Sequence, residues 1–201
     1  MKKRKVTVTN KFQLVLDVGG VLISNLSPTW EGISSVSSLS PKELKKYFNE
    51  EIRHDFWTGN IPEEYFWSWV IKHCPTLDIK NARSLLQKNL MPLAAFDCIA
   101  NWSELADIHL LSNHREEWLD PLIQPLKPYL KSFTISSSVG CCKPNSEIYS
   151  IVHSHFTNQH EIWFVDDQEK NFAPAKTLGW NTLIADQNGE WIGQIEKLLN
   201  K

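Results

Sequence analysis

The chain has 201 residues, of which 42% are hydrophobic, so it can bury a full core in one domain or in one domain that carries an insertion. Its formal net charge of -2 provides no overall basic field for nucleic acid or an anionic membrane surface. No stretch approaches the roughly 18 apolar residues of a membrane span. These properties favour a small-molecule ligand and leave the oligomeric state open.

The N-terminal segment and the cysteines predict a cytoplasmic protein. The basic residues 1–5 look like the start of a signal peptide, but no apolar core and no small-residue cleavage site follow them. A reducing compartment fits the cysteines, because none has the spacing of a zinc site. They are Cys74, Cys98, Cys141 and Cys142.

The first half of the chain predicts one strand followed by helices. A short apolar strand is expected at about 13–18, and the Ser-rich stretch 24–40 has the composition of a connecting loop. Ser40 to Glu43 form a capping box with proline at the first helical position, which predicts a helix to about His54. Further helical patterns cover about 63–74, 78–89 and 93–105.

The second half alternates between strands and helices. Apolar strand patterns occur at 108–112, 132–136, 162–166 and 181–185, and helical patterns near 115–123, 146–156, 170–178 and 190–199. Largely apolar strands joined by helices are typical of a parallel sheet covered on both faces. We therefore predict an α/β fold: a three-layer, Rossmann-like parallel-sheet core formed by 1–26 and 101–201, with a small α-helical insertion at 27–100 after the first strand.

Polar residues directly follow several of the apolar strands. They are Asp17, Ser112 with Asn113, and Asp166 with Asp167, while Lys143 follows its strand across the loop SVGCC. Taken singly, each has an ordinary structural explanation, such as a helix cap, a solvated turn or a surface lysine. In an open parallel sheet, however, ligands bind beyond the carboxyl ends of the strands. The predicted fold therefore brings all of these side chains to one crevice.

These residue types suit phosphoryl transfer. Asp17 can act as a nucleophile and form an acyl phosphate. Adjacent carboxylates such as Asp166 and Asp167 repel each other and favour a nearby cation. A divalent metal held by Asp17 and this pair, together with Lys143, would neutralise a phosphoryl group. Mg²⁺ suits an all-oxygen site of this kind.

Donor groups near the strand ends would bind the remaining phosphate oxygens. They are the side chains of Ser112 and Asn113 and the backbone N–H groups of the turn at Val18 and Gly19. Gly19 and Gly20 let the backbone approach the metal and the phosphate closely, which side chains would prevent.

Four motifs occur in order at suitable strand ends, namely LVLDVGGVL, LLSN, KPNSEIY and FVDDQEKN. Together they resemble the haloacid dehalogenase (HAD) superfamily of hydrolases, from about residue 12 to the end of the chain. The resemblance implies that Asp17 is the nucleophile, that Ser112 binds phosphate and that Lys143 is the lysine of the third motif. The metal ligands that it implies are Asp17, the Gly19 carbonyl, Asp166 and, in support, Asp167.

The resemblance also gives the helical insertion a role, because it is similar to the family's cap, which closes over the crevice and selects substrates. The D-x-G of the first motif is similar to that of small sugar-phosphate phosphatases of the glucose-1-phosphatase type. We therefore predict a Mg²⁺-dependent phosphatase of small phosphate monoesters, in particular sugar phosphates, that works through an aspartyl-phosphate on Asp17. Trp57 in the cap is a candidate for stacking on a sugar face.

Gly19 marks a departure from the family pattern. Most family phosphatases have a second aspartate there, which protonates the leaving oxygen and later activates water, and such general acid–base help is worth about 10² to 10⁴ in rate. Three interpretations are open. The cap supplies another group, with His54, Asp55 and Glu64 as candidates; or the substrate has an easy leaving group, such as an anomeric hydroxyl; or the protein is a weakly catalytic binding or regulatory module.

A metal-independent 2-haloacid dehalogenase is a separate alternative, since those members of the family also lack the second aspartate. They need no metal, however. The adjacent carboxylates of Asp166 and Asp167 therefore argue against this alternative.

Overall fold

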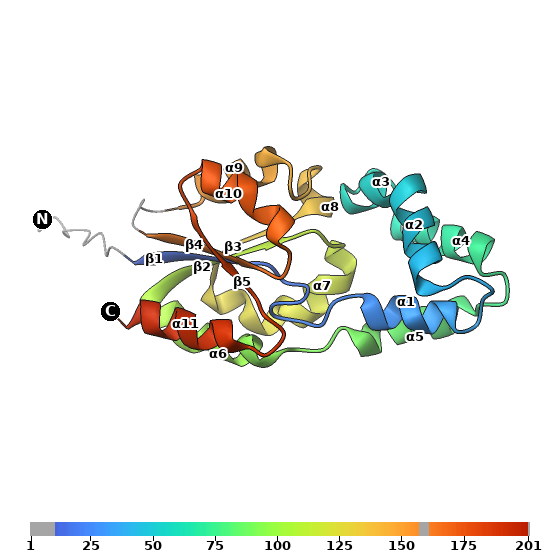
Figure 1. The fold of residues 1–201 in the computed structure, drawn as a ribbon, viewed down its shortest axis with the longest axis horizontal. Coiled ribbons are helices and arrows are strands. Elements are labelled where there is room, and N and C mark those ends of the chain that lie inside the picture. Colours follow the sequence, from blue (N-terminus) through green and yellow to red (C-terminus); the bar gives the residue numbers. More distant parts are fainter. Residues whose placement is uncertain (1–10, 157–160, 201) are drawn as a thin grey trace, which may run out of the picture.

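Within the described residues, five parallel strands form a sheet in the order β3-β2-β1-β4-β5 (Figure 1). The structure, a computed structural model, describes residues 11–156 and 161–200, so the basic segment 1–5 lies outside the described residues. The strands are β1 (Phe12–Leu16), β2 (Ala106–Ser112), β3 (Leu130–Ile135), β4 (Ile162–Asp166) and β5 (Asn181–Ile184). The predicted parallel sheet is confirmed.

The strand register brings the polar strand ends together. Leu16 of β1 is aligned with Leu110 of β2 on one side and with Val165 of β4 on the other. Because parallel strands all run in one direction, the residues that follow these strands emerge at the same edge of the sheet. Asp17 and Asp166 therefore meet at the centre of that edge.

Helices cover both faces of the sheet and make three layers (Figure 1). Side chains alternate between faces along a strand, so Val15 packs on one face while Leu14 and Leu16 pack on the other. The helices on the Val15 face are α9 (Ser146–Ser154) and α10 (Phe172–Thr177). The opposite face is covered by α6 (Ala94–Leu105), α7 (Glu116–Ile123) and α11 (Glu190–Leu199).

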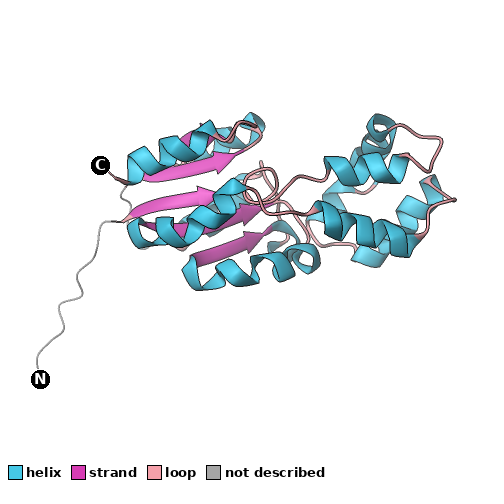
Figure 2. Cartoon of the chain, turned by 90° about the horizontal axis from the view of Figure 1, so that it is seen from below, coloured by secondary structure: helices cyan, strands magenta, loops and turns pink. Residues whose placement is uncertain are grey.

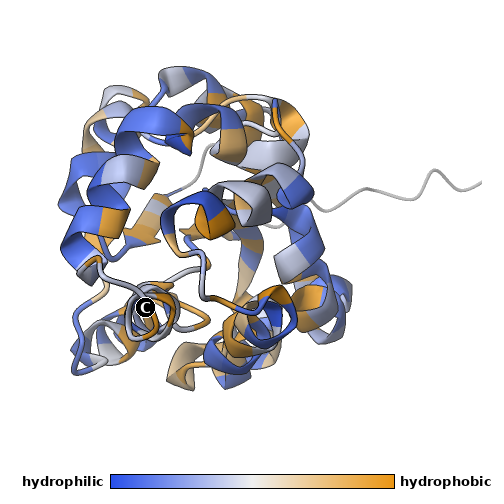
Figure 3. Ribbon diagram, turned by 90° about the vertical axis from the view of Figure 1, so that its right-hand side faces the viewer, coloured by the Kyte–Doolittle hydropathy of each residue, from blue (hydrophilic) through white to orange (hydrophobic). Residues whose placement is uncertain are grey.

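A helical lobe is inserted between β1 and α6 and stands apart from the sheet (Figure 2). Its helices are α1 (Ser27–Ser34), α2 (Pro41–Glu51), α3 (Arg53–Trp57), α4 (Glu63–His73) and α5 (Ile79–Asn89). They carry both hydrophobic and hydrophilic residues (Figure 3), and their aromatic side chains form an interior in which Phe48 contacts Trp30, Phe56 and Phe66. We call this lobe the cap.

The N-terminus of α2 has the capping box that the sequence predicts. The Ser40 hydroxyl accepts a hydrogen bond from the Glu43 backbone N–H, and the Glu43 carboxylate accepts one from the Ser40 N–H at 2.9 Å. The predicted continuation to His54 is wrong, because α2 ends at Glu51 and α3 begins at Arg53. Ile52 between them has φ -136°, outside the helical region.

The Ser-rich stretch 24–40 is not only a loop as expected, since it contains α1. Trp30 and Ile33 of this helix are buried in the cap core, and Pro28 lies at its start. Tertiary burial outweighs the loop-like composition here. Two further short elements were not predicted, namely α8 (Ser136–Val139) and the 3₁₀ helix η1 (Gln124–Tyr129), while the helix expected at 170–178 begins as the 3₁₀ helix η2 (Glu169–Asn171).

The expected cap boundary at residue 100 falls inside α6. This helix contacts β2, η1 and α11, all of which belong to the sheet layers. We therefore propose that the core resumes at about residue 93 rather than 101, with the rest of the predicted division unchanged.

The two chain segments that join the cap to the core run side by side. Ser24 N–H donates to the Met91 carbonyl at 2.8 Å, and Leu93 N–H donates to the Leu22 carbonyl at 2.8 Å. These hydrogen bonds between the two connections fix the place where the chain leaves the sheet edge for the cap and returns from it. Among the described helices, none combines the length and apolar character needed to cross a bilayer.

Candidate active site

Asp17 lies directly beyond the central strand β1. Its backbone N–H donates to the Val165 carbonyl at 2.9 Å, which continues the pairing with β4 by one residue. Its Oδ1 accepts hydrogen bonds from the Val18 N–H at 2.7 Å and from Lys143 Nζ at 2.9 Å. The side chain is only 7% exposed, so the carboxylate is held at the base of the crevice in a fixed orientation.

Lys143 links the two central carboxylates. Its Nζ lies 2.9 Å from Asp17 Oδ1 and 2.6 Å from Asp166 Oδ2, and its side chain is 1% exposed. Burial alone would lower the pKa of Lys143, but the two carboxylates outweigh that effect and raise it, so the ammonium group stays charged. Asn113 fixes the lysine's backbone, since its amide donates to the Lys143 carbonyl and its oxygen accepts from the Lys143 N–H.

Asp166 and Asp167 face different surroundings. Asp166 is fully buried, and besides Lys143 its oxygens accept hydrogen bonds from the Asn171 amide and the Gln168 N–H. Asp167 is half-buried and lines the cavity described below. Burial raises the pKa of the Asp167 carboxyl group. Asp167 is therefore the carboxylate of the pair that a ligand can reach.

The three carboxylates form a candidate metal centre. Asp17, Asp166 and Asp167 each offer an oxygen atom, and these oxygens all lie within 4.8 Å of one another. Lys143 balances only part of their charge. Burial raises the pKa of Asp17 to about 7 against the opposing effect of Lys143, and the nearby Asp166 and Asp167 carboxylates add to the rise. A hard divalent cation with oxygen ligands fits this donor set.

The glycine pair after Asp17 shapes the same centre. Gly20 has φ +82°, and a Cβ atom there would lie 2.5 Å from Asp167 Oδ2, so only glycine lets the turn approach this carboxylate. At Gly19, an added Cβ atom would meet nothing within 4 Å. The position where a second aspartate would stand is therefore open space beside Asp17.

A cavity of about 410 Å³ opens over this centre, between core and cap. Core residues that line it include Asp17, Gly19, Ser112, Asn113, Lys143, Asp167 and Asn171, and cap residues include Trp30, Lys45, Phe48, Asn49, Arg53 and Trp57. The side chains at the strand ends thus converge, as the sequence predicts. Val18 and Asp166 do not line this cavity, and the Val18 N–H is engaged by Asp17.

The cap residues considered as replacements for the missing aspartate point elsewhere. His54, Asp55 and Glu64 are exposed and do not line the cavity. Their exposure follows from the packing of α3 and α4, whose buried faces carry aromatic residues instead. In this arrangement of the cap, none of the three side chains lines the cavity, so their role as the replacement group stays a prediction.

His114 was not singled out from the sequence, although it follows Ser112 and Asn113 directly. It lines the cavity wall, and its ring contacts Trp57 of the cap and Trp118 of α7. Burial lowers the pKa of His114 to about 4, so the ring is neutral at pH 7. Its Nδ1 has no hydrogen-bond partner within the described part of the chain.

Arg115, the next residue, ties the cap to the core. Its Nη1 donates to the carbonyls of Phe56 and Ile61 at 3.1 and 2.9 Å. In the same region, Gly59 of the cap approaches α8 so closely that a Cβ atom there would lie 2.2 Å from the Ser137 carbonyl oxygen. Ser137 is itself next to Arg115, since its hydroxyl accepts a hydrogen bond from the Glu116 N–H at 3.2 Å. The turn that follows α3 is therefore in close contact with the core beside the site.

Comparison with known proteins identifies the fold. No protein-family model matches the chain, and no curated protein matches it. Among solved structures, a predicted HAD-like family hydrolase from Porphyromonas gingivalis is 23% identical, with a TM-score of 0.78 over 96% of this chain and 100% of that chain. The HAD family enzyme bt-2542 from Bacteroides thetaiotaomicron, in a mutant complexed with magnesium and inorganic phosphate, is 19% identical, with a TM-score of 0.76 over 92% of this chain and 98% of that chain.

A dehalogenase shares the architecture at a greater distance. L-2-haloacid dehalogenase from Xanthobacter autotrophicus, with chloropropionic acid covalently bound, is 15% identical, with a TM-score of 0.59 over 89% of this chain and 80% of that chain. The chain therefore has the fold of the HAD-like hydrolases, as the four motifs indicated. Fold likeness at this identity leaves the reaction to be argued from the site.

Proposed function

We propose that this protein is a Mg²⁺-dependent phosphatase of small phosphate monoesters, in particular sugar phosphates. The observation that carries the proposal is the buried Asp17 carboxylate, held by Lys143 beside two further carboxylates and facing a cavity of about 410 Å³. The magnesium and phosphate complex of the similarly folded bt-2542 supports the same assignment.

Asp17, Asp167, Asp166 and the Gly19 carbonyl would hold the metal, with Asp167 as the carboxylate of the pair that faces the cavity. When bound, Mg²⁺ supplies positive charge that neutralises the phosphate oxygens and keeps Asp17 ionised. Lys143 supplies the second positive centre from within the protein.

Asp17 is the proposed nucleophile. Its Oδ1 accepts the hydrogen bonds from Val18 and Lys143, which leaves Oδ2 to attack phosphorus. A bond forms between this oxygen and phosphorus while the bond to the leaving oxygen breaks. Water then attacks phosphorus, the aspartyl-phosphate bond breaks, and inorganic phosphate leaves a regenerated carboxylate. Ser112 and backbone N–H groups at the same edge would bind the phosphate oxygens.

The open space at Gly19 favours substrates with an easy leaving group. Gly19 offers no carboxyl group to protonate a departing alkoxide, and the three cap candidates do not line the cavity. The leaving groups of anomeric and aryl phosphates are more acidic hydroxyl compounds than ordinary alcohols. Their hydrolysis therefore depends less on a general acid. This reasoning supports anomeric sugar phosphates over esters of primary alcohols.

Hydrolysis of glucose 1-phosphate, an aryl phosphate and a primary-alcohol phosphate should be measured with and without Mg²⁺. We expect metal-dependent hydrolysis, fastest for the first two, and none for Asp17→Asn. Activity that survives this substitution would contradict the mechanism. Absence of hydrolysis in the unmodified protein would favour the binding or regulatory module instead, and release of halide from chloropropionic acid without metal would favour the dehalogenase.

A further inference from the structure

Apart from Asp17, Asp167 and Lys143, the charged side chains that line the cavity are all positively charged. In the described part of the chain, the carboxylates that line the cavity are Asp17 and Asp167, both at the metal centre. Apart from Lys143, the remaining charged side chains are all cations. They are Lys45 on α2, Arg53 at the start of α3 and Lys170 in η2.

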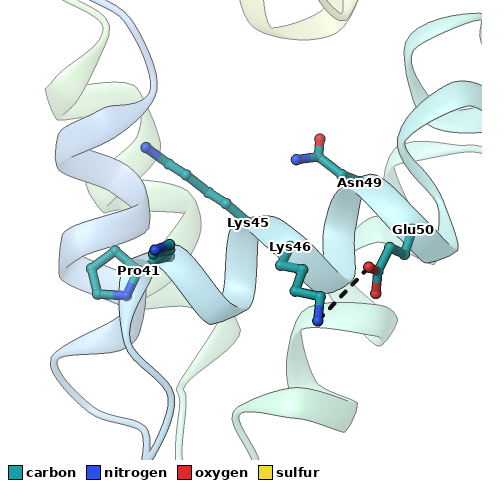
Figure 4. Close-up of a pocket in the computed structure, with 6 residues that line it drawn as sticks. Pro41, Lys45, Lys46, Asn49 and Glu50 are labelled. Carbon is teal, nitrogen blue, oxygen red and sulfur yellow. Dashed lines mark ion pairs between the residues drawn. The ribbon is translucent and has the colours of Figure 1, made fainter.

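Lys45 lies on the cap face that looks into the cavity. Lys45 and Asn49 are four residues apart on α2, which places them along one side of successive helical turns, and Arg53 at the start of α3 lines the same cavity. Figure 4 shows Lys45 extending away from its neighbour Lys46, whose Nζ lies 4.0 Å from Glu50 Oε1. Lys45 itself donates to the Ser27 hydroxyl at 3.3 Å and pairs with no carboxylate among the described residues.

Arg53, at the start of α3, lines the same cavity from the cap side. Arg53 is half-buried and, like Lys45, has no carboxylate partner within the described residues. A partly buried cation without a counter-ion has lost part of its hydration. An anionic ligand that hydrogen-bonds to the cation would offset that loss.

We infer that the substrate carries a second anionic group, a phosphate or a carboxylate, which Lys45 and Arg53 of the cap bind while the phosphate ester reaches Asp17. This inference rests on the proposed phosphatase function and narrows its substrate class. Lys170 adds a third cation at the rim, and the aromatic rings of Trp30 and Trp57 line the wall against which the carbon skeleton lies. A cavity of about 410 Å³ has room for such a small, doubly charged ester.

The test compares kcat/KM for glucose 1,6-bisphosphate and glucuronic acid 1-phosphate with kcat/KM for glucose 1-phosphate, which has the same anomeric leaving group but no second anion. The first two substrates distinguish a phosphate from a carboxylate as the second group. The quantity compared is the ratio of kcat/KM for the preferred two-anion ester to kcat/KM for the one-anion ester. Because each variant removes a charge-assisted hydrogen bond to the second anion, we expect Lys45→Met and Arg53→Met each to lower this ratio by roughly ten- to a hundredfold. Because each ratio comes from one preparation, partial unfolding of a variant does not affect it.

Lys46→Met provides the matched control. Lys46 is the neighbour of Lys45 on the same helix, but its side chain is 68% exposed and does not line the active-site cavity. This variant should leave the ratio unchanged. Equal efficiency for one-anion and two-anion esters, or an unchanged ratio in both cavity variants, would overturn the inference and leave the phosphatase proposal standing. Hydrolysis of none of the esters would overturn both.

Discussion

Replacing Lys143 by methionine tests whether the buried charges of the site are organised as described. Methionine keeps the length of the side chain but removes the cation between Asp17 Oδ1 at 2.9 Å and Asp166 Oδ2 at 2.6 Å. All three side chains are at most 7% exposed, so water cannot solvate the carboxylates that are left behind. Removing one partner of a buried pair costs about 3 to 5 kcal/mol of unfolding free energy, and we expect a loss of that size.

The loss should depend on pH. Burial raises the pKa of Asp17 to about 7 even though Lys143 opposes the rise, so removing the lysine raises it further above the ordinary value of 3.8. A carboxyl group whose pKa is raised on folding destabilises the protein increasingly as pH rises from its unfolded to its folded value. The stability deficit of Lys143→Met should therefore be larger at pH 8 than at pH 5.5. Added Mg²⁺ should reduce the deficit at pH 8.

Urea unfolding monitored by tryptophan fluorescence measures these differences. The matched control is Lys127→Met, because Lys127 Nζ lies 2.6 Å from Asp120 Oδ1 but both side chains are more than 40% exposed. An exposed pair of that length contributes about 0 to 1 kcal/mol. Equal losses in the two variants, or a Lys143→Met deficit that does not change with pH, would refute the reasoning.

Three further changes have defined outcomes. Gly19→Asp, whose Cβ atom would meet no atom within 4 Å, should raise kcat for primary-alcohol phosphates by up to about 10² while changing aryl phosphate hydrolysis little; equal gains for both would contradict the role given to Gly19. Burial lowers the pKa of His109 to about 4 from an ordinary 6.5, so the unfolded chain binds more protons than the folded protein between these pH values. On going from pH 8 to pH 5, the unmodified protein should therefore lose about 2 kcal/mol more of its unfolding free energy than His109→Gln does, as measured by urea unfolding. Gly59→Ala should lower the melting temperature more than Gly140→Ala, because both glycines have φ +78° but only the Cβ at Gly59 would collide, with the Ser137 carbonyl.

The sequence by itself determined the sheet, most of the helices and the sheet edge at which the proposed site residues emerge. Apolar runs of strand length separated by helical patterns required a covered parallel sheet, and the capping box at Ser40 marked the start of α2. Since parallel strands end at one edge, Asp17, Ser112 and Asp166 had to emerge at that edge, and the strand order β2-β1-β4 makes them neighbours.

Other features depended on packing that local patterns do not encode. The Ser-rich stretch became α1 because Trp30 and Ile33 found a buried face among helices far along the chain. The same packing of α3 and α4 turned His54 and Glu64 outward, since a helix orients its polar side chains by which of its faces is buried.

Only the tertiary structure decided how the charges are paired. Lys143 lies 126 positions after Asp17 in the sequence and 23 positions before Asp166, yet its ammonium group bonds to both. Spacing along the chain carries no information about which of two adjacent carboxylates is buried, and it is the fold that encloses Asp166 and opens Asp167 to the cavity. The same holds for Lys45 and Arg53, because the direction of a cap side chain is fixed by contacts between the cap and a sheet that forms from other parts of the sequence.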